Sequence, residues 1–153
     1  MKEIMKKTGL LVLFLGLFGG LFAQSADMDK LFGKYDGKRH FEKFEYGSEK
    51  PIWMKLIAHN ASFVKVLTCD SKPNTRKYKK FNQDVRKSVE HFNVVFELNE
   101  QDYLFKICAT EKDREGCSDY VVVSRLGEKE RVIWLYGKTN IKKFIDYVKD
   151  ALM

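Results

Sequence analysis

Few residues of this 153-residue chain have the types and spacing that catalysis or metal binding requires. The histidines His40, His59 and His91 have neither the helical spacing of paired ligands nor a cysteine partner in a metal-binding pattern. The chain contains no Gly-x-Ser-x-Gly nucleophile motif, and nothing in the sequence pairs two carboxylates across a cleft. We therefore assign no catalytic, cofactor-binding or metal-binding residue, and we expect a binding protein rather than an enzyme.

A Gly-Lys-Thr sequence at residues 137–139 stands between an expected strand and an expected helix, which is the position of a phosphate-binding loop. That motif needs another glycine five residues before the Gly-Lys pair, and residue 132 is a valine. Without that glycine the backbone has no loop that can cradle a phosphate. We interpret these residues as a strand-to-helix turn in which Thr139 caps the helix.

The cysteines Cys69, Cys108 and Cys117 allow one disulfide and one free thiol. Cys108 and Cys117 flank a polar turn between two strand-like runs, and residues that face each other across a hairpin come within disulfide reach. The sequence slightly favours a Cys108–Cys117 bridge. The alternative is two separate buried thiols, because free cysteine packs as a small hydrophobe. We expect Cys69 to be a buried thiol rather than a nucleophile.

Positive charges crowd the segment from residue 72 to residue 87, and they form our candidate interaction surface. Its members are Arg76, Lys77, Lys79, Lys80, Arg86 and Lys87. Aromatic and aliphatic residues recur with helical spacing in the same segment. Two interpretations stay open: the cations bind an acidic protein or an anionic membrane surface, or they only solvate the outer face of an amphipathic helix.

The hydrophobic spacing predicts four helices. They run from a cap at Ser25 or Asp27 to Asp36, from Ser48 to Asn60, from Asn74 to Phe92, and from Thr139 to Leu152. The first helix is expected to bury Met28, Leu31, Phe32 and Tyr35, and the last to bury Ile141, Phe144, Ile145, Val148 and Leu152.

Strand-like runs occupy most of the remaining chain. They cover Lys38–Tyr46 as an edge strand, Phe63–Cys69, Val94–Leu98, Tyr103–Cys108, Tyr120–Ser124 and Arg131–Tyr136. Short polar links join the last four runs, which predicts an antiparallel meander. The fold class that follows is a single α+β domain, with a mainly antiparallel sheet that amphipathic helices cover on one face.

The N-terminus has the three parts of a secretory signal: a basic start, an apolar run from Leu10 to Ala23, and a small residue at its end. This run is 14 residues long, whereas a membrane-spanning helix needs about 20. We interpret residues 1–23 as a cleaved signal peptide and residues 24–153 as the single domain. Because no cysteine follows the run, we expect a periplasmic or cell-surface protein that is soluble after cleavage and is not a lipoprotein. An uncleaved membrane anchor is the alternative.

The composition, with 44% hydrophobic and 32% charged residues, is that of one globular domain and excludes a disordered or multidomain chain. The formal net charge is +7, of which the predicted signal carries +2 through Lys2, Lys6, Lys7 and Glu3. In an exported protein a basic surface meets acidic proteins or anionic lipids, so we expect no nucleic-acid partner.

The order of the elements also carries a resemblance. Val64-Lys-Val-Leu-Thr68 precedes a Lys/Arg-rich helix, and Val132-Ile-Trp-Leu-Tyr-Gly137 precedes the closing helix. Over most of residues 27–152 the chain resembles the DUF4252 family of exported proteins from Bacteroidetes-type bacteria. That family has no established activity and no agreed catalytic residues. The resemblance therefore implies an envelope or surface-associated protein and transfers no site residue.

From these observations we expect an exported envelope protein whose domain binds a protein or an anionic surface without catalysis. The alternative is a small periplasmic hydrolase or small-ligand-binding protein whose site is assembled only in the fold. A fold with no cleft and with a continuous basic or apolar patch favours the first. A deep polar pocket with convergent carboxylates or histidines favours the second.

Overall fold

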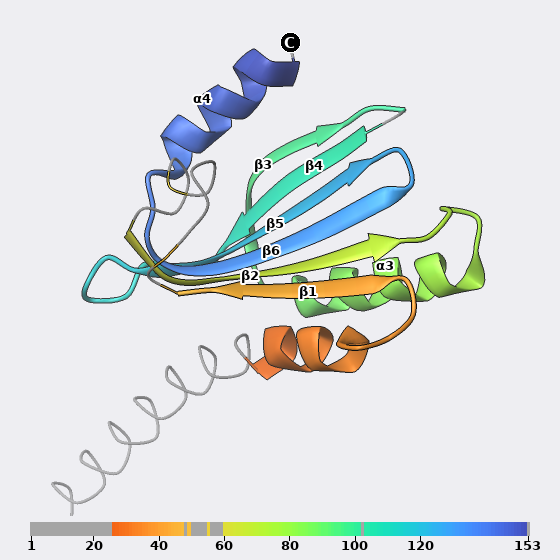
Figure 1. Cartoon of the computed structure of the whole chain (residues 1–153). Coiled ribbons are helices and arrows are strands. Elements are labelled where there is room, and N and C mark those ends of the chain that lie inside the picture. Colours follow the sequence, from red (N-terminus) through yellow and green to blue (C-terminus); the bar gives the residue numbers. More distant parts are fainter. Residues whose placement is uncertain (1–25, 48, 50–54, 56–59, 102, 153) are drawn as a thin grey trace, which may run out of the picture.

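The computed structural model describes residues 26–47, 49, 55, 60–101 and 103–152. Along the chain the elements are helix 26–35, β1 (Phe41–Tyr46), β2 (Asn60–Asp70), α3 (Arg76–Ser88), β3 (Asn93–Asn99), β4 (Tyr103–Ala109), β5 (Ser118–Leu126), β6 (Lys129–Lys138) and α4 (Ile141–Leu152) (Figure 1). The predicted signal peptide and most of the helix predicted from Ser48 lie outside the described residues. Within the described ranges, no helix is both long and apolar enough to cross a membrane.

The strands form one six-stranded sheet in the order β1-β2-β6-β5-β4-β3, and every neighbouring pair is antiparallel. The four-strand meander from β3 to β6 is confirmed. β2 pairs with the outer side of β6 and places β1 at the edge of the sheet, as predicted for the run that ends at Tyr46. The chain is thus a single α+β domain built on an open antiparallel sheet.

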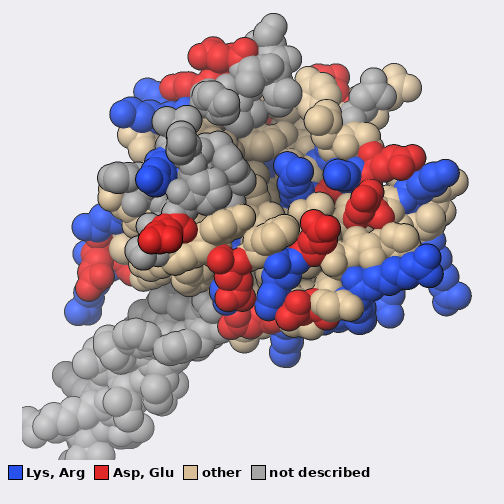
Figure 2. All heavy atoms as spheres, in the orientation of Figure 1, with Lys and Arg blue, Asp and Glu red and all other residues tan. Residues whose placement is uncertain are grey.

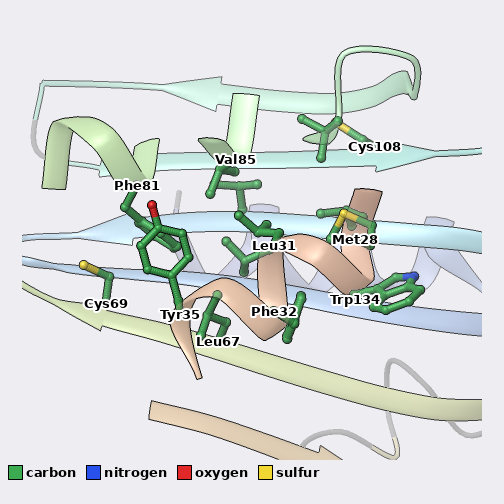
Figure 3. Close-up of a cluster of buried hydrophobic side chains, with 14 of the residues drawn as sticks. Met28, Leu31, Phe32, Tyr35, Leu67, Cys69, Phe81, Val85, Cys108 and Trp134 are labelled. Atoms are coloured by element: carbon green, nitrogen blue, oxygen red, sulfur yellow. The ribbon is translucent and has the colours of Figure 1, made fainter. Parts of the chain in front are cut away.

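Helix 26–35 and α3 cover one face of the sheet and enclose the main core (Figures 1 and 3). The helical residues that enter this core are Met28, Leu31, Phe32, Tyr35, Tyr78, Phe81 and Val85, all buried as their spacing predicts. The Tyr35 and Phe81 rings meet edge to face with their centroids 5.0 Å apart, which joins the two helices. The sheet supplies Leu67, Cys69, Cys108, Val121, Val123, Val132 and Trp134.

α3 is shorter than predicted at its C-terminal end. Thr75 is its N-cap, with an extended backbone and a side-chain oxygen that accepts a hydrogen bond from the Tyr78 backbone N–H at 3.3 Å. The helix ends at Ser88, and the Phe92 N–H then bonds to the Val89 carbonyl oxygen at 3.0 Å in a turn. Val89 and Phe92 are nevertheless buried in the core, which is why the apolar spacing of the helix continues through them in the sequence.

α4 covers the opposite face of the sheet, which corrects the prediction that the helices pack on one face (Figure 1). Phe144 of α4 is buried against Ile107 and Val122, and its ring centroid lies 5.8 Å from that of Phe105. The physical reason is visible in β5, where residues 120–123 are all buried although successive strand residues point to opposite faces. A consecutive run of buried residues requires cover on both faces.

Candidate functional site

The outer surface of α3 carries the cations that the sequence singled out. Arg76, Lys77, Lys79, Lys80, Arg86 and Lys87 are all exposed, and together we call them the basic face. Figure 2 shows Lys and Arg side chains gathered at the end of the molecule where α3 begins in Figure 1. Because Tyr78, Phe81 and Val85 point into the core, the amphipathic helix expected for this segment is present.

No carboxylate in the described part of the chain forms an ion pair with the basic face. Asp84, the acidic residue of α3, is instead held by helix 26–35: its Oδ2 lies 2.7 Å from Lys34 Nζ and accepts a hydrogen bond from the Tyr35 hydroxyl. Burial alone would raise the pKa of Asp84, but the hydrogen bonds from Lys34 and Tyr35 lower it below its ordinary value. Asp84 therefore joins the two helices. Its charge also acts on Lys80, and that of Glu130 acts on Arg86, but neither pair lies within ion-pair distance.

A groove of about 480 Å³ runs between helix 26–35 and α3 beside the basic face. Its charged lining is mixed: Lys30, Lys34 and Lys87 stand among Asp27, Asp84 and Glu90. Such alternation gives no net preference for an anion or a cation. The groove is thus a boundary of the basic face rather than a separate binding site.

Beneath α3 lies a buried polar cluster that the sequence reasoning missed. Glu130 of β6 is completely buried, and its Oε1 accepts a hydrogen bond from Asn82 Nδ2 at 3.1 Å. Nearby, an Arg125 guanidinium N–H donates to the Tyr78 hydroxyl at 3.2 Å. Burial raises the pKa of Glu130, and the Asn82 hydrogen bond and the Arg125 charge offset only part of that effect. The cluster joins α3 to β5 and β6 and lines neither of the two pockets described here.

The three cysteines are free thiols, so the structure does not bring Cys108 and Cys117 together. The hairpin between β4 and β5 is present, but its register places Cys108 opposite Val121. Cys117 lies four residues before Val121, which is roughly 13 Å along a strand and far beyond disulfide reach. Cys69 is fully buried, and burial first, then the nearby Glu130 charge, raises its pKa to about 11. A thiol with that pKa is not a nucleophile at neutral pH.

The Gly-Lys-Thr turn has a structural explanation that differs in part from the predicted one. Gly137 has a φ of 146°, and a Cβ there would lie 2.7 Å from the Ala61 Cα, so β6 needs a glycine where it passes β2. The capping residue of α4 is Asn140, whose Oδ1 accepts from the Lys143 N–H at 3.2 Å. The prediction that Thr139 is the cap is therefore wrong. The Thr139 hydroxyl is buried and makes no hydrogen bond with the part of the chain that the structure describes.

The histidines and carboxylates do not assemble into a metal centre within the described residues. His40 has a φ of 73° in the turn before β1, and His91 Nε2 lies 3.4 Å from Glu90 Oε1 at the surface. His59 is outside the described residues.

Fold and surface together define the chain as an α+β domain with an open antiparallel sheet, two covered faces and one helix with an exposed basic face. Searches with this sequence find no matching protein family and no matching curated protein.

Proposed function

We propose that this chain is a non-enzymatic binding domain and that the basic face of α3 docks onto an acidic segment of another protein. The observation that supports this most strongly is the set of six exposed cations without an ion-paired carboxylate in the described chain. They project from a helix that is fixed to the sheet by a buried aromatic stripe. A preformed surface of one sign steers an oppositely charged partner and orders few side chains on binding.

An acidic protein fits this surface better than a membrane does. Helices that lie in a membrane interface combine cations with exposed apolar residues that enter the acyl boundary. The apolar stripe of α3 is buried in the core. Among the described residues, the large hydrophobic side chains that are exposed lie on strands or strand ends: Phe44, Val94, Val95 and Leu126. The outer surface of α3 therefore offers charge without an apolar anchor.

We further propose, from the sequence alone, that residues 1–23 direct export and that the domain acts in the periplasm or at the cell surface. The resemblance to the DUF4252 family supports the same compartment. Intact-mass measurement of the protein isolated from its native cells tests this proposal. A mass that begins at residue 24 or close to it agrees with export, whereas a mass that retains Leu10–Ala23 contradicts a cleaved signal.

Binding of a fluorescent oligoglutamate peptide, followed by anisotropy over a range of salt concentrations, tests the docking surface. The test variant reverses Lys79, Lys80, Arg86 and Lys87 to Glu. The control reverses Arg114, Lys129, Arg131 and Lys143, which are exposed cations on other elements. We expect the test variant to lose at least about tenfold in affinity and the control less than about threefold. Binding to the unchanged protein should weaken with salt, because exposed charges are screened.

Equal losses in the two variants would show that only net charge matters and would overturn the proposal. Vesicles of phosphatidylglycerol and phosphatidylcholine form a second arm. If they bind the protein more tightly than the peptide does, and only the α3 variant loses this vesicle binding, the partner is a membrane instead.

In living cells, a photo-crosslinker at Gln83 on the outer surface of α3 should trap an acidic peptide of one protein, and the trapped product should vanish in the α3 variant.

A further inference from the structure

A pocket of about 510 Å³ opens where β6 ends and α4 begins. Three lysines from three parts of the chain line it: Lys112 from the β4–β5 loop, Lys138 from the end of β6, and Lys142 from the first turn of α4. Asn60, Tyr120, Thr139 and Asn140 complete its described polar lining. The Lys138 side chain runs along the β4–β5 loop, where a methyl group added at Gly116 would lie 3.9 Å from its Cε.

The charge of this pocket is of one sign. Its described lining contains the three lysines and no carboxylate, in contrast to the mixed groove between helix 26–35 and α3. The nearby Asp113 is engaged in holding its own loop, since its carboxylate accepts from the Tyr136 hydroxyl at 2.6 Å and from the Cys117 N–H at 2.9 Å. Positive charges that line one concave site raise the local concentration of anions there.

Hydrogen-bond donors at the start of α4 also lie at this pocket. The first N–H groups of a helix have no partner within the helix, and the Asn140 side chain satisfies the one on Lys143. Thr139 belongs to the pocket lining, and its hydroxyl oxygen is buried and has no hydrogen-bond partner among the described residues. A buried hydroxyl that lacks a partner is unusual in a native protein. Thr139 lies between Lys138 and the N-terminus of α4, where positive charge and free helix N–H groups both favour an anion.

We propose that this pocket binds a compact dianion of the phosphate-monoester class. Lysine ammonium groups act as point charges toward phosphate oxygens and need no bidentate geometry. The Gly-Lys-Thr turn beside the pocket is not a nucleotide loop, because Gly137 serves the close approach of β2 and β6. The proposal is independent of the basic face, and it gives the small-ligand alternative a specific site. The phosphate group can belong to a soluble monoester or to a lipid headgroup.

Two-dimensional NMR titration of the full domain with inorganic phosphate and with glycerol 3-phosphate tests the site, against sodium chloride at equal ionic strength. We expect saturable shifts in the amide signals of residues 112–116 and 138–142, with dissociation constants in the millimolar range or tighter. Replacing Lys138 and Lys142 by Gln should weaken binding at least about tenfold. The matched control, Lys79 and Lys80 to Gln, removes the same charge from α3 and should change affinity less than about twofold.

Shifts that do not saturate, or that spread equally over α3, would overturn the proposal, as would equal losses in the two variants. Vesicles of phosphatidic acid in phosphatidylcholine distinguish the source of the phosphate group. Vesicle binding that glycerol 3-phosphate displaces, and that the pocket variant loses, assigns a lipid headgroup. Binding of the soluble monoester without vesicle binding assigns a soluble ligand.

Discussion

Glu130 is the side chain whose ionisation most directly opposes folding, because it is fully buried and burial raises its pKa. In the unfolded chain the same carboxyl titrates at its ordinary pKa. Between the two pKa values the folded state therefore binds more protons, and the free energy of unfolding falls as pH rises. Glu130→Gln keeps an acceptor for Asn82 and cannot ionise. We expect it to raise the free energy of unfolding by on the order of 1 kcal/mol at pH 7.5 and to change it little near pH 4.

Urea unfolding at several pH values, with Glu128→Gln as an exposed control on the same hairpin, measures this difference. Part of the pH slope should remain in the Glu130 variant, because burial also raises the pKa of Asp119, which accepts a hydrogen bond from Trp134 Nε1. If Glu130→Gln instead lowers stability at pH 7.5 and leaves the slope unchanged, then the ionised carboxylate and Arg125 stabilise the fold as a pair.

Substitutions at Thr139 should change the stability of the domain and its affinity for phosphate in opposite directions. Its hydroxyl is buried without a hydrogen bond, and a methyl group in the same place needs none. We expect Thr139→Val to raise the free energy of unfolding by about 1 kcal/mol and to weaken phosphate binding. Thr139→Ser should retain binding. Thermal unfolding and the NMR titration together check this, and a Val variant that binds phosphate normally would remove the hydroxyl from the site.

The junction of β2 and β6 depends on one glycine. An alanine Cβ at position 137 would lie 2.7 Å from two backbone atoms, at a φ that L residues rarely adopt. We expect Gly137→Ala to lower the free energy of unfolding by about 2–4 kcal/mol. Gly33→Ala is the matched control: it lies in helix 26–35 with no atom near the added methyl. There the same change should raise stability by about 1 kcal/mol. Chemical unfolding of both variants should show opposite signs, and equal effects would contradict the close approach.

Elements with a regular apolar period could be predicted from the sequence, and their placement on the sheet could not. Met28, Leu31, Phe32 and Tyr35 follow the helical period, and all four are buried. The meander was predictable because polar turns separate its strands. The position of α4 does not follow from assigning residues 120–123 to a strand. It follows from their apolar side chains, which point alternately to both faces of the sheet and are all buried, so both faces need cover.

The candidate sites also differ in whether local sequence spacing can predict them. The basic face lies within one helix, so local spacing was enough to define it. Glu130 was missed because it follows a polar turn, although it continues the alternation of buried Val132 and Trp134. The lysine pocket was out of reach because its lining comes from residues 60, 112, 138 and 142, which only the strand pairing brings together. The disulfide hypothesis failed for a related reason, since cysteine spacing does not fix a hairpin register.

Across the whole domain the two basic surfaces are separated by the sheet and its core, with α3 on one face and α4 on the other. Coupling between two sites requires an element whose two states both ligands bias. The basic face and the lysine pocket share no residue and lie on separate elements. At constant ionic strength, saturating the lysine pocket with glycerol 3-phosphate should therefore change the oligoglutamate affinity less than about twofold. A titration of the peptide at several ligand concentrations measures this. Mutual displacement would show instead that one extended anionic partner occupies both surfaces, in which case the Lys138 and Lys142 variant would also lose the peptide.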